Sequence, residues 1–440
     1  TENLSLDWCL SRQRYFGVPI PVWYPLDDAG QPDYDRPIVA EGAAMPVDPT
    51  TDVPPGYDAS QRGVPGGFVG DPDIFDTWFT SSLTPQISSH WGEDADRHAR
   101  LFPADVRPQG HDIIRTWAFY TIAKAMLHED DVPWHHVLIS GWILDPDRKK
   151  MSKSKGNVMT PLPLIEQYTA DAARYWAASA RLGADTAFDE NVWKIGKRLV
   201  TKLFNAAKFV LGQTGEQHPI TTELDRAFVA KLSALVDQAT RSFDAYQYAH
   251  ALQETESFFW THFTDTYLEL AKGRARAYAD GATGEAAAAS GSAVAALRLG
   301  LSVLVRLFAP VLPYITEEIW SWSFAAESAG DGSGAASSVH RAAWPGPADF
   351  ASIEGPAHAA SFDVAVAALA AINKAKADAE VSMGREVATL RLAASPSTAA
   401  VLEGVLPDVL AAARVASHVL ESRDGLEEGV VEVAAIEFAE

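Results

Sequence analysis

The chain has 440 residues, a hydrophobic fraction of 47% and a formal net charge of -22. That length is too great for one hydrophobic core and predicts roughly two to four domains. The single cysteine excludes an internal disulfide bond and a cysteine-rich zinc site, and it fits a reducing compartment. The acidic surplus argues against non-specific nucleic-acid binding by the whole surface. The sequence contains no run of eighteen uncharged apolar residues, so we expect no membrane-spanning segment.

The N-terminal part joins an aromatic, arginine-rich segment, residues 1–25, to a long stretch of turn-forming residues. The chain begins at Thr1, without the basic-then-apolar layout of a signal peptide, which predicts a cut inside a larger protein. Residues 26–70 are rich in Pro, Gly and Asp and lack periodicity. We therefore expect an irregular insertion or surface loop there.

Regular structure is predicted further along the chain. Residues 111–128 have the pattern of an amphipathic helix, and Gly110 before it would let a backbone approach a ligand closely. The apolar run 137–144 predicts a buried strand. A helix, a strand and a glycine-bearing loop in this order indicate an α/β layer with a parallel sheet.

A basic loop follows the predicted strand, with the sequence Arg148-Lys149-Lys150-Met151-Ser152-Lys153-Ser154-Lys155-Gly156-Asn157. Its five Lys and Arg residues stand out in an acidic chain. Lysines and hydroxyl groups beside a glycine suit a polyphosphate that must be gripped and then released. The alternative is a solvated loop, and the sequence context on both sides favours phosphate binding.

From about residue 192 the pattern becomes all-helical. One predicted buried stripe, at helical spacing, consists of Leu199, Val200, Leu203, Phe204, Ala207 and Val210. Lys194, Arg198 and Lys202 form a second stripe at i, i+4 on another face, which is either a solvated helix face or a track for phosphates. Further helices are expected, and they cover 223–277, 293–310 and 313–326. Two Ala/Gly/Ser-rich stretches, 279–292 and 327–338, read as loops or linkers.

The last part of the chain has a mixed pattern. Its expected elements are a helix over 362–380, a strand over 387–392, a helix over 398–414 and a strand over 430–436. Lys374, Lys376 and Arg385 are candidates for contact with RNA, but a solvated helix face is the favoured interpretation.

Four segments carry a resemblance to a known family. Lys150 to Ser154 match its Lys-Met-Ser-Lys-Ser signature, and Trp8–Gly17, Asp76–Phe79 and Gly110–Ile113 resemble three further active-site segments in the right order. From residue 1 to about 345, the chain resembles the C-terminal portion of class I aminoacyl-tRNA synthetases of the valine, isoleucine and leucine group. Residues 181–190 are similar to the valyl branch in particular.

The resemblance implies an α/β fold followed by an all-α fold. Residues 1–191 would form the second half of a class I Rossmann-like nucleotide-binding fold, residues 192–345 a helical-bundle anticodon-binding domain, and residues 346–440 a small C-terminal α/β unit. The sequence has no His-Ile-Gly-His motif. We therefore expect the first half of the catalytic domain and the editing domain to be missing, and the chain alone to be inactive and unable to edit.

The resemblance also assigns roles to residues. In this family the amino-acid carboxylate attacks the α-phosphate of ATP, so the protein must position two anions and neutralise charge on the phosphates. Lys153 is the expected main transition-state contact, and Lys150 is the second catalytic residue. The implied ATP-binding residues are Gly110, Asp112, Lys150, Ser152, Lys153 and Ser154. Trp78, with Tyr15 and Phe16, would line the amino-acid pocket.

The implied cofactors and partners follow from the same family. ATP would bring Mg²⁺ with it, without assignable protein ligands, and zinc is not expected because residues 26–70 contain no cysteine. Valine and tRNA(Val) are the implied partners, with Lys194, Arg198 and Lys202 along the tRNA backbone. The resemblance further implies a monomeric, cytoplasmic enzyme. The alternatives are an isoleucyl-tRNA synthetase segment and a non-catalytic tRNA-binding protein derived from a synthetase.

Overall fold

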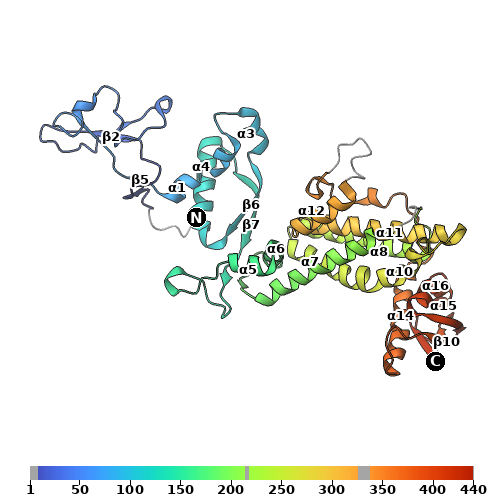
Figure 1. Cartoon of the computed structure of the whole chain (residues 1–440). Helices are drawn as coiled ribbons and strands as arrows, with labels where there is room; N and C mark the ends of the chain where they lie inside the picture. Colours follow the sequence, from blue (N-terminus) through green and yellow to red (C-terminus); the bar gives the residue numbers. More distant parts are fainter. Residues whose placement is uncertain (1–7, 214–217, 326–336, 440) are drawn as a thin grey trace. The chain divides into compact units, whose positions relative to one another are not determined.

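The computed structural model describes residues 8–213, 218–325 and 337–439 of the chain, and only the backbone of Lys153 (Figure 1). The chain divides into two compact units. The first comprises residues 1–142 and 182–185, and the second comprises residues 143–181 and 186–440. The basic loop thus belongs to the same unit as the helical region.

Short antiparallel strands make up the N-terminal part of the first unit. These elements are β1 (Ser11–Arg12), β2 (Val22–Pro25), β3 (Ile38–Val39), η1 (Gly42–Ala44), η2 (Ala59–Gln61), β4 (Phe68–Gly70) and β5 (Ile74–Phe75). β1 pairs with β5, and β2 lies between β3 and β4 over a small core of Trp23, Ala40 and Phe68. The expectation of an irregular insertion over 26–70 is therefore wrong in part. Proline and glycine separate strands that are too short to show periodicity.

The rest of the first unit is an α/β arrangement. Its elements are α1 (Thr77–Ser81), α2 (Thr84–Ser89), α3 (Ala95–Leu101), β6 (Ala104–Gly110), η3 (His111–Ile113), η4 (Ile114–Ala118), α4 (Phe119–Glu129) and β7 (Trp134–Ser140). β6 was not predicted, but it pairs with β7 in parallel, as expected of this sheet, with Gly110 opposite Ser140. The helix predicted over 111–128 forms, although it begins with a 3₁₀ turn and a π turn. The prediction of a buried strand is wrong, because this described sheet has two strands and Val137 is 41% exposed.

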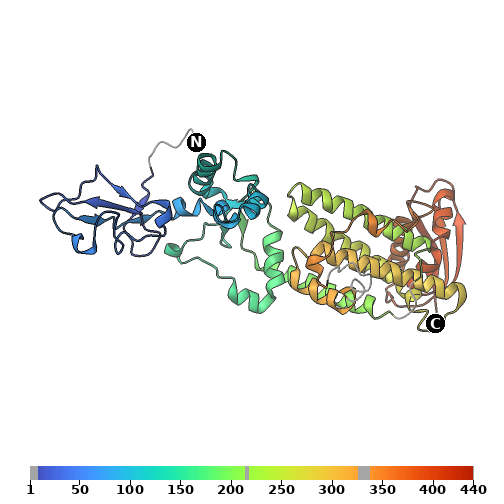
Figure 2. The ribbon, with the colours of Figure 1, turned by 90° about the horizontal axis from the view of Figure 1, so that it is seen from above.

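The second unit is mainly a bundle of long helices (Figures 1 and 2). Its elements before the C-terminal part are β8 (Ile143–Leu144), η5 (Lys153–Lys155), α5 (Leu162–Tyr168), α6 (Ala170–Ala178), β9 (Thr186–Ala187), α7 (Glu190–Leu211), α8 (Glu223–Asp244), α9 (Tyr248–Phe258), η6 (Phe259–Tyr267), α10 (Leu268–Arg276), α11 (Gly284–Phe308) and α12 (Pro313–Trp322). β8 and β9 form a second short parallel pair. α11 packs against α7, α8 and α10 and is the central helix of the bundle.

The central helix α11 corrects one prediction. Residues 279–292 were expected to be a linker, but α11 begins at Gly284, and Ser290 and Ser292 are fully buried. Small side chains there let neighbouring helices approach closely. α11 is also long and apolar enough to cross a membrane by length and composition, but 67% of its most apolar window is buried inside the protein. The loop predicted over 327–338 lies largely outside the described residues.

The C-terminal part of the second unit is a small α/β layer. Its elements are η7 (Val339–Arg341), η8 (Pro347–Asp349), α14 (Ser361–Asp378), β10 (Val387–Ala394), α15 (Pro396–Glu403), α16 (Leu406–Ala413), β11 (Val415–Ser422) and β12 (Val431–Phe438). β10 is the middle strand, parallel to β11 and antiparallel to β12. The single helix predicted over 398–414 is two helices, because Gly404 ends one and Pro407 lies in the first turn of the next. β11 was not predicted.

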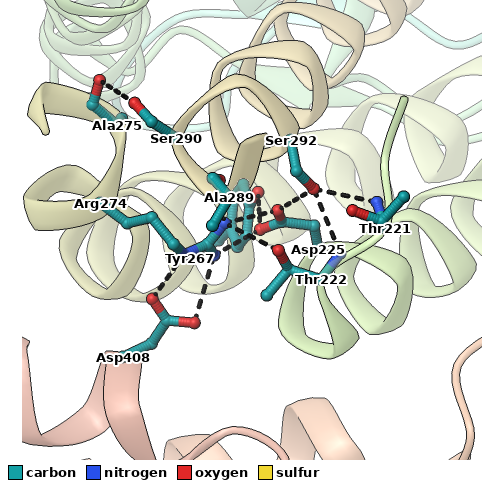
Figure 3. Close-up of polar contacts among 10 residues, drawn as sticks. All are labelled: Thr221, Thr222, Asp225, Tyr267, Arg274, Ala275, Ala289, Ser290, Ser292 and Asp408. Atoms are coloured by element: carbon teal, nitrogen blue, oxygen red, sulfur yellow. Dashed lines mark hydrogen bonds and ion pairs between the residues drawn. The ribbon is translucent and has the colours of Figure 1, made fainter. Parts of the chain in front are cut away.

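The bundle and the C-terminal layer share one hydrophobic core. A buried polar cluster also joins them (Figure 3). Arg274 of α10 donates two hydrogen bonds of 2.7 Å to Asp225 of α8, and its Nε donates to Asp408 of α16 at 2.8 Å. The hydroxyl groups of Tyr267 and Ser292 each donate to Asp225 at 2.7 Å. The polar groups of this junction therefore satisfy one another away from water.

Candidate functional site

The carboxyl ends of the parallel strands β6 and β7 carry the first group of predicted site residues. Gly110 is the last residue of β6, and a Cβ there would lie 2.8 Å from Oδ1 of Asp112. Glycine therefore leaves room for this exposed carboxylate to fold back over the strand end. The ring of His111 lies 3.2 Å from the Ser140 carbonyl oxygen through Nδ1 and packs on Trp142. Ligands of open α/β sheets bind at this edge.

Asp76 organises the second group, at the start of α1. Its carboxylate accepts the backbone N–H of Trp78 at 3.0 Å and pairs with Arg12 at 2.7 Å, and it is 6% exposed. This capping bond fixes where α1 begins, and so the direction of the half-buried Trp78. Sequence reasoning quoted this segment but did not identify the role of Asp76.

A cavity of about 330 Å³ lies beside Asp76. Its lining includes Phe16, Gly17, Asp76 and Thr77, so the structure brings Phe16 to the start of α1. Trp78 does not line this cavity. Tyr15 does not line it either, and its side chain is fully exposed.

The basic loop is folded around two residues, Asp145 shortly before it and Asn157 at its C-terminal end. The Asp145 carboxylate accepts the backbone N–H of Lys149 at 2.7 Å and the side-chain amide of Asn157 at 2.8 Å. The Asn157 side chain also accepts the backbone N–H of Ser152 at 3.0 Å and donates to the carbonyl of Lys150 at 3.3 Å. These bonds lower the pKa of Asp145, which is 7% exposed, and so keep it ionised. The loop therefore has a defined base.

Within that loop, Lys150 and Ser154 are exposed and Ser152 is half-buried. The backbone of Lys150 bridges to Leu144. The hydroxyl oxygens of Ser152 and Ser154 lie 3.2 Å apart. The side chain of Lys153 lies outside the described part of the structure. The loop is in the second unit, whereas Gly110 and Trp78 are in the first.

A groove on α7 brings the predicted cationic stripe together with an aromatic residue. The groove measures about 470 Å³ and is lined by Tyr168, Lys194, Lys197, Arg198, Thr201, Lys202, Asn205 and Trp260. Lys194 pairs with Glu190 at 3.5 Å and Lys202 with Asp265 at 3.2 Å. The Nζ of Lys202 also lies 5.2 Å from the centroid of the Trp260 ring.

Two family models match the chain. Residues 2–189 match tRNA synthetases class I (I, L, M and V), and residues 225–391 match the anticodon-binding domain of tRNA ligase. Proteins named valine–tRNA ligase are 50% identical over 99% of this chain in Thermobifida fusca and 46% identical over 100% of it in Bifidobacterium longum. The chain belongs to the class I aminoacyl-tRNA synthetases.

The synthetase segment spans about half the length of these curated relatives, 48% and 50% respectively. A solved structure of a leucyl-tRNA synthetase from Agrobacterium radiobacter, in a ternary complex with tRNA, is similar to this chain, with a TM-score of 0.57 and 21% sequence identity. The match covers 80% of this chain and 43% of the leucyl-tRNA synthetase chain. That likeness supports the class I fold. The relatives support the valyl branch over the isoleucyl one.

Sequence reasoning missed several residues that shape these sites in the synthetase segment: Asp76, Asp145, Asn157, Trp260 and Asp265. Asp145 and Asn157 had a detectable signal, because Asp and Asn beside a Pro- or Gly-containing turn commonly bond to nearby backbone. Trp260, which lines the groove, and Asp265, which pairs with Lys202, had no such signal, since both come from a helix far along the chain. Among the described residues, no group of three or more His, Cys, Asp or Glu is placed to hold a metal ion.

Proposed function

We propose that the complete gene product is a valine–tRNA ligase, which activates valine with ATP and transfers it to tRNA(Val). The observation that carries this proposal is 50% identity, over 99% of the chain, to a protein of that name. Because the chain covers 48% of that relative, the activity is proposed for the complete gene product.

In the activation of valine, the protein has to position the two substrates and neutralise negative charge on the phosphates. The carboxylate of valine is itself the nucleophile that attacks the α-phosphate, and pyrophosphate leaves. We expect Lys150 and Lys153 to neutralise the charge that builds on the phosphates, with Ser152 and Ser154 donating hydrogen bonds beside them. The support is a basic loop whose backbone is braced by Asp145 and Asn157. A braced loop presents its donors without reorganising at the moment of reaction.

The remaining residues with a proposed role in binding ATP or valine belong to the first unit. Gly110 and Asp112 would hold the ATP ribose, because a carboxylate accepts hydrogen bonds from sugar hydroxyls and glycine permits close approach. Trp78 and Phe16 would enclose the valine side chain. The capped start of α1 supports the role of Trp78, and Phe16, although 91% exposed, lines the cavity beside Asp76. Tyr15 was proposed for the same pocket, but its full exposure gives that role no support.

Mg²⁺ is expected to accompany ATP. It commonly keeps several waters and binds through substrate phosphates and one or two carboxylates. The described residues offer no cluster of three carboxylate, imidazole or thiol groups for it. We expect the ion to bind mainly through the phosphates of the nucleotide.

The groove on α7 is the proposed contact for tRNA. Lys194, Arg198 and Lys202 are spaced one helical turn apart, which suits successive phosphates of a nucleic-acid backbone. Arg198 is exposed and has no ion pair among the described residues, so its charge is available to a phosphate. A local cationic groove explains how a strongly acidic chain can bind RNA.

The test of the proposed activity is Lys153→Ala in the complete gene product. Valine-dependent exchange between ATP and pyrophosphate should fall about a hundredfold or more, because a pre-placed contact to the transition state is removed. Lys149→Ala is the matched control, since the Lys149 side chain pairs with Asp147 and is 69% exposed. Exchange that is unchanged in Lys153→Ala, or that is fastest with isoleucine or leucine, contradicts the proposal.

A further inference from the structure

An acidic residue beside the groove on α7, Asp265, pairs with one of the cations that line it. Asp265 pairs with Lys202 at 3.2 Å, and the side chains are 59% and 38% exposed, respectively. The hydroxyl of Thr264 donates to the same carboxylate oxygen at 3.1 Å and holds it in place. Lys202 therefore has a partner inside the protein before any RNA arrives.

The same lysine covers an aromatic ring. Its Nζ lies 5.2 Å from the centroid of Trp260, within the distance at which a cation is attracted to an indole face. The indole N–H of Trp260 donates to Glu256 at 3.3 Å, which fixes the ring at the wall of the groove. Lys202 is thus held between a carboxylate and an aromatic face.

A π-helix brings Trp260 and Asp265 to the same lysine. Both lie in η6, where hydrogen bonds join residues five apart, and Trp260 and Asp265 are five apart. In an α-helix, residues with this separation would be rotated by about 140° from each other. The Thr266 hydroxyl donates to the carbonyl of Thr261 at 2.7 Å, across the same spacing. The wider turn is what lets one helix present an aromatic ring and a carboxylate to one cation.

We propose that Asp265 is a specificity-determining residue of the α7 groove: it holds Lys202 over Trp260, so that the groove admits an RNA that supplies both a phosphate and an unstacked base. The phosphate draws Lys202 away from Asp265, and the base takes the uncovered face of Trp260. A polyanion without exposed bases has to break the Lys202–Asp265 pair and gains no stacking in return. Stacking of a base on an aromatic side chain is sequence-tolerant but requires a single strand. The partner favoured by this groove is therefore a looped or single-stranded RNA segment.

This inference rests on the proposed tRNA contact, and its test separates the two. The complete gene product and its Asp265→Asn variant are titrated with a tRNA(Val) transcript and with a blunt RNA duplex, at several salt concentrations. Asp265→Asn should bind the duplex about two- to fivefold more tightly, the range expected when one exposed ion pair no longer competes. The affinity for tRNA should rise less, so that discrimination falls. The dependence of duplex affinity on salt should steepen by about one phosphate contact.

Asp363→Asn is the matched control, because Asp363 pairs with Lys231 at 2.7 Å with a similar exposure, 60%, and Lys231, unlike Lys202, does not line the groove. Arg198→Ala tests the groove itself and should weaken tRNA binding. If Arg198→Ala leaves tRNA affinity unchanged, the proposed tRNA contact is wrong. If Arg198→Ala weakens binding but Asp265→Asn shifts duplex and tRNA equally, or no more than Asp363→Asn does, the role of Asp265 alone is overturned.

Discussion

At the scale of single residues, Lys376 is a charged side chain with a structural role inside the protein. The side chain is fully buried, and its Nζ donates to the carbonyls of Met383, Arg385 and Ala413 at 3.0, 2.8 and 2.8 Å. Its sequence context suggested a solvated helix face, which is wrong. The ammonium group instead binds carbonyl groups at the C-terminal end of α16 and in the turn before β10. Burial lowers the pKa of Lys376, but all three of its donors are used.

We therefore expect Lys376→Met to lower the free energy of unfolding by about 2–3 kcal/mol, because three backbone carbonyl groups, the one of Ala413 buried, lose their partner. Urea denaturation followed by far-UV circular dichroism measures the change. Lys374→Met is the control, since Lys374 is exposed on the same helix and should change stability by less than about 0.5 kcal/mol. Equal effects of the two substitutions would show that Lys376 is not a structural anchor.

At the scale of elements, the basic loop depends on Asn157 more than on its own lysines for its shape. Asn157 bonds to Asp145, to the carbonyl of Lys150 and to the N–H of Ser152. Because the folded-state pKa of Asp145 is lowered, the brace is present above the ordinary carboxyl pKa and is lost as pH falls through the folded value. The brace should therefore be complete at neutral pH.

Asn157→Ala in the complete gene product should reduce valine-dependent ATP–pyrophosphate exchange about 10- to 100-fold, since small displacements of positioned groups have effects of this size. The melting temperature should change little, because the described part of the loop packs against none of the hydrophobic core clusters. Asn191→Ala, an exposed asparagine on α7, should leave exchange intact. A loss of exchange that tracks a loss of folding would point to general destabilisation instead.

At the scale of the whole molecule, the bundle and the C-terminal α/β layer form one folding unit. Phe228 of α8 lies in the same core as Phe362 of α14, with ring centroids 6.3 Å apart. Arg274 links Asp225 to Asp408 across the junction, and burial raises the pKa of Asp408. The predicted division between residues 345 and 346 therefore crosses a continuous core.

Arg274→Met tests this unity. It leaves two buried carboxylates without their cation, which should reduce the free energy of unfolding by about 3–5 kcal/mol. Hydrogen exchange on the complete gene product should then lose protection in α8, α11 and α16 together. Arg276→Met, on the same helix, is the comparison. Protection lost in α16 alone would mean that the C-terminal layer unfolds by itself.

The sequence by itself determined the features that depend on local pattern. The basic loop, the helix after Gly110, the parallel character of the sheet and the cationic stripe of α7 all follow from short-range spacing and turn chemistry, whereas the strand β6 itself was not predicted. In the predicted apolar stripe, Leu199, Leu203, Ala207 and Val210 are buried, whereas Phe204 is 37% exposed and packs on Trp322.

The tertiary structure alone decided which distant residues meet. Asp408 is 134 residues from Arg274, Asp265 is 63 residues from Lys202, and the partners of Lys376 come from other elements. No local period encodes such pairs, because they exist only after helices have packed and the π-turn has set the rotation of η6. The sequence thus identified the cations of the groove. Packing decided that one of them, Lys202, contacts both the carboxylate of Asp265 and the ring of Trp260.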